Sequence, residues 1–195
     1  MNNSVLLGIL RPYYFYLSKN SDFYRKYYKL LGFCPKNIFL YKQAFLHNSR
    51  SKKVVGIKAK TNNERLEYLG DAVLDLIIAE LLYKKFPFQG EGFLTDMRSK
   101  SASRNMLSKI ATSMGLDEFI EIDPSIAKNR SAVNSISGNA LEALIGAIYV
   151  DKGYHFTKRY IKNKIVKPFL GFDELKNITG NFKSLLHQYA PNNKQ

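Results

Sequence analysis

Apolar residues recur with a helical period over most of the chain, and the clearest run covers residues 63–86. Its apolar positions fall about 3.6 residues apart over many turns, which is typical of a helix with one buried face. They are Leu66, Leu69, Val73, Leu74, Ile77, Ile78, Leu81 and Leu82. A second strong run covers residues 137–151, and Gly153 is expected to stop the helix there. The two runs predict two long helices, each burying one stripe.

Weaker runs complete the pattern. They predict helices at 10–32, 37–48, 95–100, 102–114 and 154–169, with Thr95 capping the third of these and Asn62 or Asn63 capping the long helix. Residues 49–62 are expected to form a polar, basic loop, residues 90–92 a turn, and residues 123–137 a polar stretch. No strand-like alternation is long enough to predict a sheet, so the predicted fold class is all-α.

The first long helix carries three acids on one face. Glu64 and Glu67 are three residues apart, and Glu67 and Asp71 are four apart, so all three are neighbours on the helix surface. Like charges at these spacings destabilise a helix unless an arginine, a lysine or a metal compensates them. Gly70 costs this helix on the order of 1 kcal/mol relative to alanine. Close approach by another helix would explain that glycine.

The second long helix repeats the arrangement, with Asn139 and Glu142 three residues apart and Gly146 one turn further on. If the two helices cross, they pool carboxylate and amide oxygens, which are the ligands that Mg²⁺ prefers. Ordinary salt bridges from these acids explain the pattern as well, and spacing alone slightly favours them. Their partners would be Arg65, Arg98 and Lys100.

The net charge of +14 is unevenly distributed along the chain. It amounts to +11 over residues 1–60, −4 over residues 61–151 and +7 over residues 152–195. Basic outer segments attract a polyanion, whereas an acidic middle repels it unless a cation intervenes. A polyphosphate substrate with Mg²⁺ between it and the carboxylates accounts for both signs. A solvated basic surface accounts for composition about equally well.

Four ordered blocks change this balance, because together they resemble the ribonuclease III family. Residues 63–74 (NERLEYLGDAVL) resemble its signature helix, and residues 44–49 (AFLHNS) resemble a helix that ends in a His-x-Ser motif. Residues 91–99 (EGFLTDMRS) resemble its Glu-Gly-x-Leu-Thr-x-x-Arg segment, and residues 139–149 (NALEALIGAIY) resemble its second catalytic helix. The histidine of the second block, His47, is interpreted as a structural hydrogen-bonding residue and not as a general base.

The resemblance implies an all-α endonuclease domain, a helical bundle that forms a homodimer. It implies Mg²⁺-dependent hydrolysis of double-stranded RNA to 5′-phosphate and 3′-hydroxyl ends, with Mn²⁺ as a substitute cation and ribosomal RNA precursors as expected substrates. The implied metal ligands are Glu67, Asp71, Asn139 and Glu142, of which Asp71 and Glu142 are the catalytic pair. The residues implied to lie near the cleft or the dimer interface are Glu64, Glu91 and Arg98.

One position departs from the commonest family pattern, because Asn139 stands where an aspartate usually binds metal. An amide oxygen still binds Mg²⁺ but brings no charge, so weaker metal affinity and slower cutting are expected. The alternative is a catalytically weakened or inactive ribonuclease III-like module that binds double-stranded RNA. The three retained carboxylates oppose this alternative.

The expected domain organisation is an endonuclease domain at residues 1–172 followed by a linker and short helix at residues 173–195. Residues 182–190 (FKSLLHQYA) resemble the opening helix of a double-stranded-RNA-binding domain that is truncated or absent. A single cysteine, Cys34, excludes an intramolecular disulfide and favours a reduced, cytoplasmic setting. No apolar run reaches the roughly 18 residues that a membrane span needs, so no membrane partner is expected.

Overall fold

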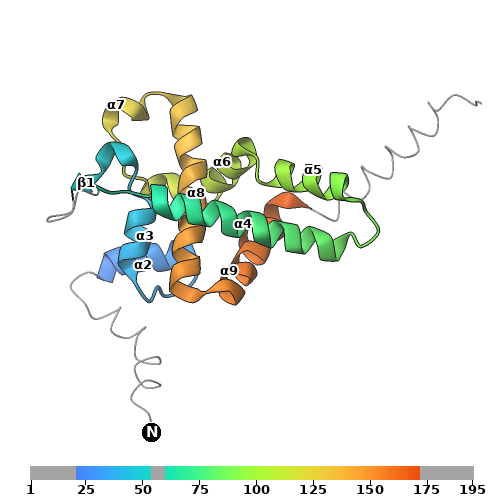
Figure 1. Cartoon of the computed structure of the whole chain (residues 1–195). Coiled ribbons are helices and arrows are strands. Elements are labelled where there is room, and N and C mark those ends of the chain that lie inside the picture. Colours follow the sequence, from blue (N-terminus) through green and yellow to red (C-terminus); the bar gives the residue numbers. More distant parts are fainter. Residues whose placement is uncertain (1–20, 54–59, 172–195) are drawn as a thin grey trace, which may run out of the picture.

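Helices dominate the computed structural model, which describes residues 21–53 and 60–171 (Figure 1). The helical elements are α2 (Ser21–Leu31), α3 (Ile38–Ala44), η1 (Asn48–Arg50), α4 (Glu64–Lys85), α5 (Glu91–Ser101), α6 (Arg104–Ser113), η2 (Leu116–Phe119), α7 (Pro124–Ala127), α8 (Arg130–Lys152), α9 (Tyr154–Ile161) and η3 (Lys162–Leu170). Two short strands, β1 (Lys52–Lys53) and β2 (Lys60–Thr61), pair antiparallel. The all-α class is confirmed, and the loop predicted over residues 49–62 contains the end of η1 and both two-residue strands.

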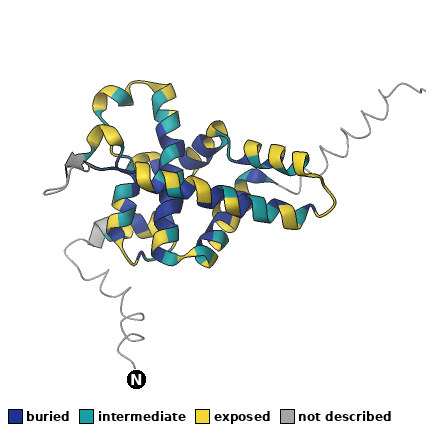
Figure 2. Cartoon of the chain, in the orientation of Figure 1, coloured by how far each residue is buried: buried dark blue, intermediate teal, exposed yellow. Residues whose placement is uncertain are grey.

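Helices α4 and α8 form the centre of the core, and they cross each other in Figure 1. The apolar stripe of α4 is buried as its period predicts, with Leu74, Ile77 and Ile78 fully enclosed. Helix α8 is buried over most of its length, and α3, α6 and α9 all pack against it. In Figure 2 the dark blue of buried residues follows this crossing, while α5 and α7 stay largely exposed.

The predicted helix at 37–48 is wrong at its end, because α3 stops at Ala44. The chain there pairs with a distant segment through an isolated parallel bridge between Leu46 and Glu121. The backbone N–H of His47 donates to the Glu121 carbonyl (3.1 Å), and the N–H of Glu121 donates to the Phe45 carbonyl (2.8 Å). This tertiary pairing satisfies backbone groups that a longer helix would have used.

Two further boundaries differ from the prediction. Residues 90–92 do not form a free turn, because α5 begins at Glu91 with Gly90 at its N-cap, and the predicted start at Thr95 is wrong. Helix α8 begins at Arg130, seven residues before the predicted start, with the side chain of Asn129 capping its first turn. For α8 this local cap outweighed the polar character of the stretch.

Helix α8 ends where the sequence predicts. Helix α8 stops at Gly153, whose φ of 77° lies in the region that favours glycine. Helix α9 then runs into the π-helical segment η3, which includes Pro168. The predicted first helix is described only from Ser21, and the helix predicted at 182–190 lies outside the described residues. No described helix combines the length and the apolar character needed to cross a membrane.

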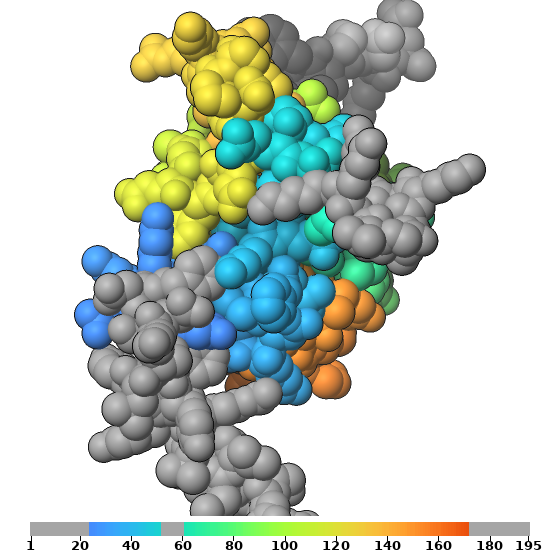
Figure 3. Space-filling model, turned by 90° about the vertical axis from the view of Figure 1, so that its left-hand side faces the viewer, coloured from blue at the N-terminus to red at the C-terminus, as the bar shows by residue number. Residues whose placement is uncertain are grey.

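Helix α2 closes the core on the face shown in Figure 3, where the blue segment meets the yellow segment that follows α6. Tyr27 of α2 packs edge-on against Phe119, with ring centroids 5.2 Å apart, and Phe45 lies 5.5 Å from Phe119. The ammonium of Lys26 lies 4.5 Å from the same ring. These aromatic contacts join three segments that are far apart in sequence.

Candidate functional site

Helices α4 and α8 touch backbone to backbone at two glycines. A Cβ atom on Gly70 would lie 1.7 Å from the carbonyl oxygen of Glu142, and one on Gly146 would lie 2.2 Å from the carbonyl oxygen of Leu66. Real Cβ atoms do not approach backbone atoms so closely, so each position accepts only glycine at this helix separation. The prediction that these glycines allow close packing of the two helices is confirmed.

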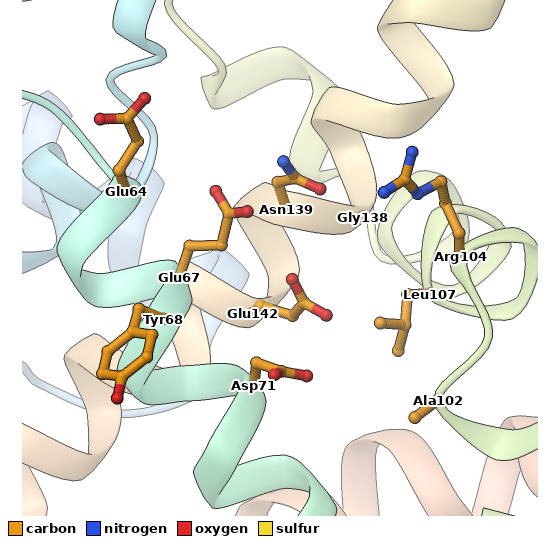
Figure 4. Close-up of a pocket in the computed structure, with 10 residues that line it drawn as sticks. All are labelled: Glu64, Glu67, Tyr68, Asp71, Ala102, Arg104, Leu107, Gly138, Asn139 and Glu142. Carbon is orange, nitrogen blue, oxygen red and sulfur yellow. The ribbon is translucent and has the colours of Figure 1, made fainter. Parts of the chain in front are cut away.

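The close crossing brings polar side chains from both helices to one cleft of about 470 Å³. Glu67 and Asp71 reach it from α4, and Asn139 and Glu142 reach it from α8 (Figure 4). Its full lining is Glu64, Glu67, Tyr68, Asp71, Ala102, Arg104, Leu107, Gly138, Asn139 and Glu142. Five of the seven residues predicted for the site therefore line the same cleft.

The first turn of α4 is held in place by the residues just before it. The side chain of Asn62 accepts a hydrogen bond from the backbone N–H of Glu64 (3.2 Å) and donates one to the Glu64 carboxylate (2.8 Å). The backbone N–H of Asn63 donates to the Leu46 carbonyl (2.9 Å). Asn62 is thus the residue whose side chain caps the helix, and it also orients the Glu64 carboxylate.

His47 serves the same scaffold and does not line the cleft. Its Nδ1 accepts from the backbone N–H of Ser49 (3.2 Å) and lies 2.9 Å from the Ser49 hydroxyl oxygen. That hydroxyl oxygen accepts from the backbone N–H of Asp123 (3.0 Å). The structural interpretation of His47 is confirmed by these bonds.

Burial and mutual repulsion raise the pKa of two acids of the cleft. Burial, followed by the charges of Asp71 and Glu67, raises the pKa of Glu142 to about 7. Burial and the charge of Glu64 also raise the pKa of Glu67, whereas a hydrogen bond with the Asn139 side chain opposes that rise. The cleft is thus an electrostatically unfavourable cluster that a cation would relieve.

The donor chemistry fits a hard divalent cation. Three carboxylates and one amide oxygen are the kind of set that Mg²⁺ or Mn²⁺ binds, usually together with water. The residues that would supply it are Glu67, Asp71, Asn139 and Glu142. Within residues 21–53 and 60–171, no three carboxylate, imidazole or thiol side chains lie close enough together to hold a metal ion as they stand. The side chains share a cleft but stand apart, as like charges do.

Two of the cations considered as salt-bridge partners of the cleft acids pair with acids outside the cleft. Arg98 contacts Asp75, with Nε and Oδ2 3.9 Å apart. Lys100 contacts Asp96, with Nζ and Oδ2 2.6 Å apart. Neither cation pairs with a cleft acid among the residues that the structure describes, so these two alternatives to a metal do not hold.

Glu91 and Arg98 lie outside the cleft, on the exposed helix α5. The Glu91 carboxylate accepts from the Thr95 hydroxyl (2.8 Å). Their expected place at a dimer interface stays a prediction. Sequence reasoning missed Arg104, which lines the cleft from the first turn of α6. Its position just after the capping residue Ser103 gave no signal, because α6 reaches the cleft only through tertiary packing.

Comparison with known proteins agrees with this geometry. The family model described as Ribonuclease-III-like matches residues 37–169. A protein named Ribonuclease 3 from Azobacteroides pseudotrichonymphae is 44% identical over 92% of this chain and 67% of its own length. Another Ribonuclease 3, from Phocaeicola vulgatus, is 42% identical over 90% of this chain and 56% of its own length. The chain therefore spans about half to two thirds of the length of these relatives.

A solved structure supports the same relationship. It is the nuclease domain of ribonuclease III from Campylobacter jejuni, described for flexibility in a region involved in dimer formation. Its identity to this chain is 37% and its TM-score is 0.64, over 73% of this chain and 95% of that domain. On the matched family model, the relatives and this shared fold, the chain belongs to the ribonuclease III family.

Proposed function

We propose that this protein is an endoribonuclease that hydrolyses double-stranded RNA with the help of Mg²⁺, or of Mn²⁺ in its place. The observation that carries the proposal is the cleft in which Glu67, Asp71, Asn139 and Glu142 meet across two helices. Membership of the ribonuclease III family supports the reaction class. The expected products carry 5′-phosphate and 3′-hydroxyl ends.

Each cleft residue has a role that its surroundings support. Glu67, Asp71, Asn139 and Glu142 would hold the divalent cation, which when bound stabilises negative charge on the phosphodiester and activates water for attack. Asp71 and Glu142 are proposed as the catalytic pair. The Asn139 side chain hydrogen-bonds with Glu67 and so helps to orient that carboxylate. The Asn62 side chain does the same for Glu64.

The proposed substrate is duplex RNA recognised by shape and backbone. A-form RNA is read mostly through its phosphates and 2′-hydroxyls, which favours a basic protein surface. The chain's net charge of +14 supports such an interaction. We also propose that the protein acts as a homodimer, which the dimer-forming region described for the related Campylobacter jejuni domain supports. Three further points stay predictions: processing of ribosomal RNA precursors, a cytoplasmic location, and the division into an endonuclease domain at residues 1–172 and a linker with the opening helix of a truncated or absent RNA-binding domain at residues 173–195.

One observation favours a second function. Asn139 brings no charge, so the cleft has one ligand charge fewer than the commonest family pattern implies. A catalytically weakened or inactive module that binds double-stranded RNA is the corresponding alternative. Against it, the chain retains three carboxylates that repel one another, and burial together with the charges of Asp71 and Glu67 raises the pKa of Glu142. This arrangement has no benefit to a purely structural protein.

A cleavage assay separates the two functions. Wild-type protein is expected to cut duplex RNA in millimolar Mg²⁺ or Mn²⁺ and not in EDTA. Glu142→Gln, which keeps the shape of the side chain, should abolish cutting, leave duplex binding intact and melt cooperatively at or above the wild-type temperature. Binding without cutting by the wild type, at any concentration of either metal, would exclude the catalytic proposal and favour the binding module.

A further inference from the structure

Arg104 is the one cation among the ten residues that line the carboxylate cleft. It stands in the first turn of α6, the third wall of the cleft, whereas the carboxylates come from α4 and α8. Figure 4 shows its side chain on the α6 wall, across the cleft from Glu67 and Asp71. The cleft thus has an acidic side and a single basic group opposite it.

The guanidinium of Arg104 is near these acids without being bonded to them. It forms no hydrogen bond or ion pair with any residue that the structure describes. Its charge nevertheless lowers the pKa of both Glu67 and Glu142, although burial and neighbouring acids outweigh it. An arginine has five N–H donors in a fixed planar fork. Here the fork is exposed and its donors are unused.

Helix stability does not explain an arginine at this position. Arg104 is the first residue of α6, where the helix dipole disfavours a cation, and the first turn contains no acid to offset it. The cap of this helix comes from Ser103, whose hydroxyl accepts from the backbone N–H of Met106 (3.4 Å). The side chain therefore brings no benefit to its own helix and faces the cleft instead.

We propose that Arg104 binds a phosphate of the RNA backbone next to the bond that is cut, and so positions the substrate in the cleft. This inference rests on the proposed function. A planar guanidinium binds two oxygens of one phosphate at once, which fixes both position and orientation. The phosphate also gains a partner on the wall opposite the carboxylates, which would otherwise repel it. Arg104 is a positioning residue in this role and holds no metal.

The competing role is that of an internal counter-charge, in which Arg104 offsets Glu67 and Glu142 and never touches RNA. The two roles differ in one respect that can be measured. A residue that binds one phosphate is energetically coupled to that phosphate alone. A counter-charge affects RNA through the overall field and is coupled to no single linkage.

The test scans single phosphates of a short RNA hairpin. Each hairpin carries one uncharged methylphosphonate linkage, at a different place in every member of the set. Binding of the full chain is measured by fluorescence anisotropy in EDTA, which prevents metal-dependent cutting. The variants are Arg104→Gln, Arg104→Lys and, as matched control, Arg159→Gln, which removes the same charge from an exposed position on α9 outside the cleft.

For the wild type and the Arg159→Gln control, neutralising one particular linkage should weaken binding on the order of tenfold. Arg104→Gln should bind more weakly from the start, lose nothing further at that linkage, and reduce the slope of log affinity against log salt by about one. Arg104→Lys should keep the salt slope and only part of the affinity, because lysine lacks the planar fork. Circular dichroism of each variant checks that the fold is retained.

If Arg104→Gln keeps the full sensitivity of the wild type at every linkage, Arg104 is a counter-charge and the inference is wrong. The same conclusion follows if Arg159→Gln removes the sensitivity as well. Failure of the proposed function is a separate result: wild-type protein that shows the coupling but never cuts in Mg²⁺ would refute catalysis and leave the phosphate contact standing.

Discussion

Gly70→Ala is the sharpest test of how the cleft is built. The added methyl carbon would lie 1.7 Å from the carbonyl oxygen of Glu142 and 2.8 Å from the backbone nitrogen of Gly146. Both neighbours are backbone atoms of α8, so no side chain can rotate away. To reach even 3.0 Å, the two helices must separate by about 1.3 Å at their crossing.

The expected loss of stability follows from this clash. Overpacking a core by one methyl group typically costs about 1–3 kcal/mol, and a rigid backbone neighbour places this case at the upper end. Alanine regains up to about 1 kcal/mol through its better helix propensity. The net loss should be about 2 kcal/mol, which lowers the melting temperature of a chain of this size by roughly 4–8 °C. Urea denaturation gives the free energy and thermal denaturation the shift.

Gly70→Ala should also lower the rate of RNA cleavage. The separation moves Glu67 and Asp71 on α4 away from Asn139 and Glu142 on α8, and a misplacement of about 1 Å in a catalytic site can reduce the rate on the order of a hundredfold. Gly92→Ala is the matched control, because Gly92 lies in α5 and a Cβ there meets nothing within 4 Å. That variant should be as stable as the wild type or slightly more so. A Gly70→Ala protein with wild-type stability and activity would refute the backbone contact.

Three further predictions concern charged groups. Because the pKa of Glu142 is raised from 4.5 to about 7, the metal-free protein should lose stability as pH rises from about 4.5 through 7. Near pH 8 the free energy of unfolding of Glu142→Gln should exceed that of the wild type by about 1–2 kcal/mol, after allowance for solvent screening. Equal melting temperatures of the two proteins in EDTA at that pH would contradict this. Hydrogen bonds from Lys158, Lys84 and Tyr154 lower the pKa of Glu80 to about 2, so its contribution is present above about pH 4.5 and disappears as pH falls toward 2. Glu80→Gln should therefore melt below the wild type near pH 6 and match it near pH 2. Asp151→Ala should lower the free energy of unfolding, measured by urea denaturation, by about 3 kcal/mol, because it leaves two backbone N–H groups and a buried tyrosine hydroxyl without their acceptor. A loss below about 1 kcal/mol would show that water replaces the carboxylate.

Much of the cleft could be predicted from local spacing. Acids three and four residues apart must share a helix face, and glycines inside two strongly periodic helices indicate close packing. The structure has Glu67 and Asp71 facing Glu142 across such a contact. Spacing could not distinguish a metal site from a salt-bridged surface, because the choice depends on which cations lie nearby in three dimensions. In the structure Arg98 pairs with Asp75, which lies outside the cleft.

The failures of prediction occurred where distant segments meet. Helix α3 ends early because Leu46 pairs with Glu121, a partner 75 residues away that no local pattern identifies. Arg104 was missed for the same reason, since nothing near it in sequence shows that α6 forms a wall of the cleft. Helix boundaries also shifted where a single cap, such as Asn129 for α8, outweighed a polar stretch.

The amino-acid sequence is enough to show that the chain is helical, that three acids lie on one face of its central helix, and which family its four blocks resemble. These properties are local, because helix period and side-chain spacing act over a few residues. Tertiary packing sets how closely α4 and α8 approach, which cation faces the acids, and the rise of the Glu142 pKa to about 7. Those properties depend on distances between residues that the chain keeps far apart, and packing alone sets them.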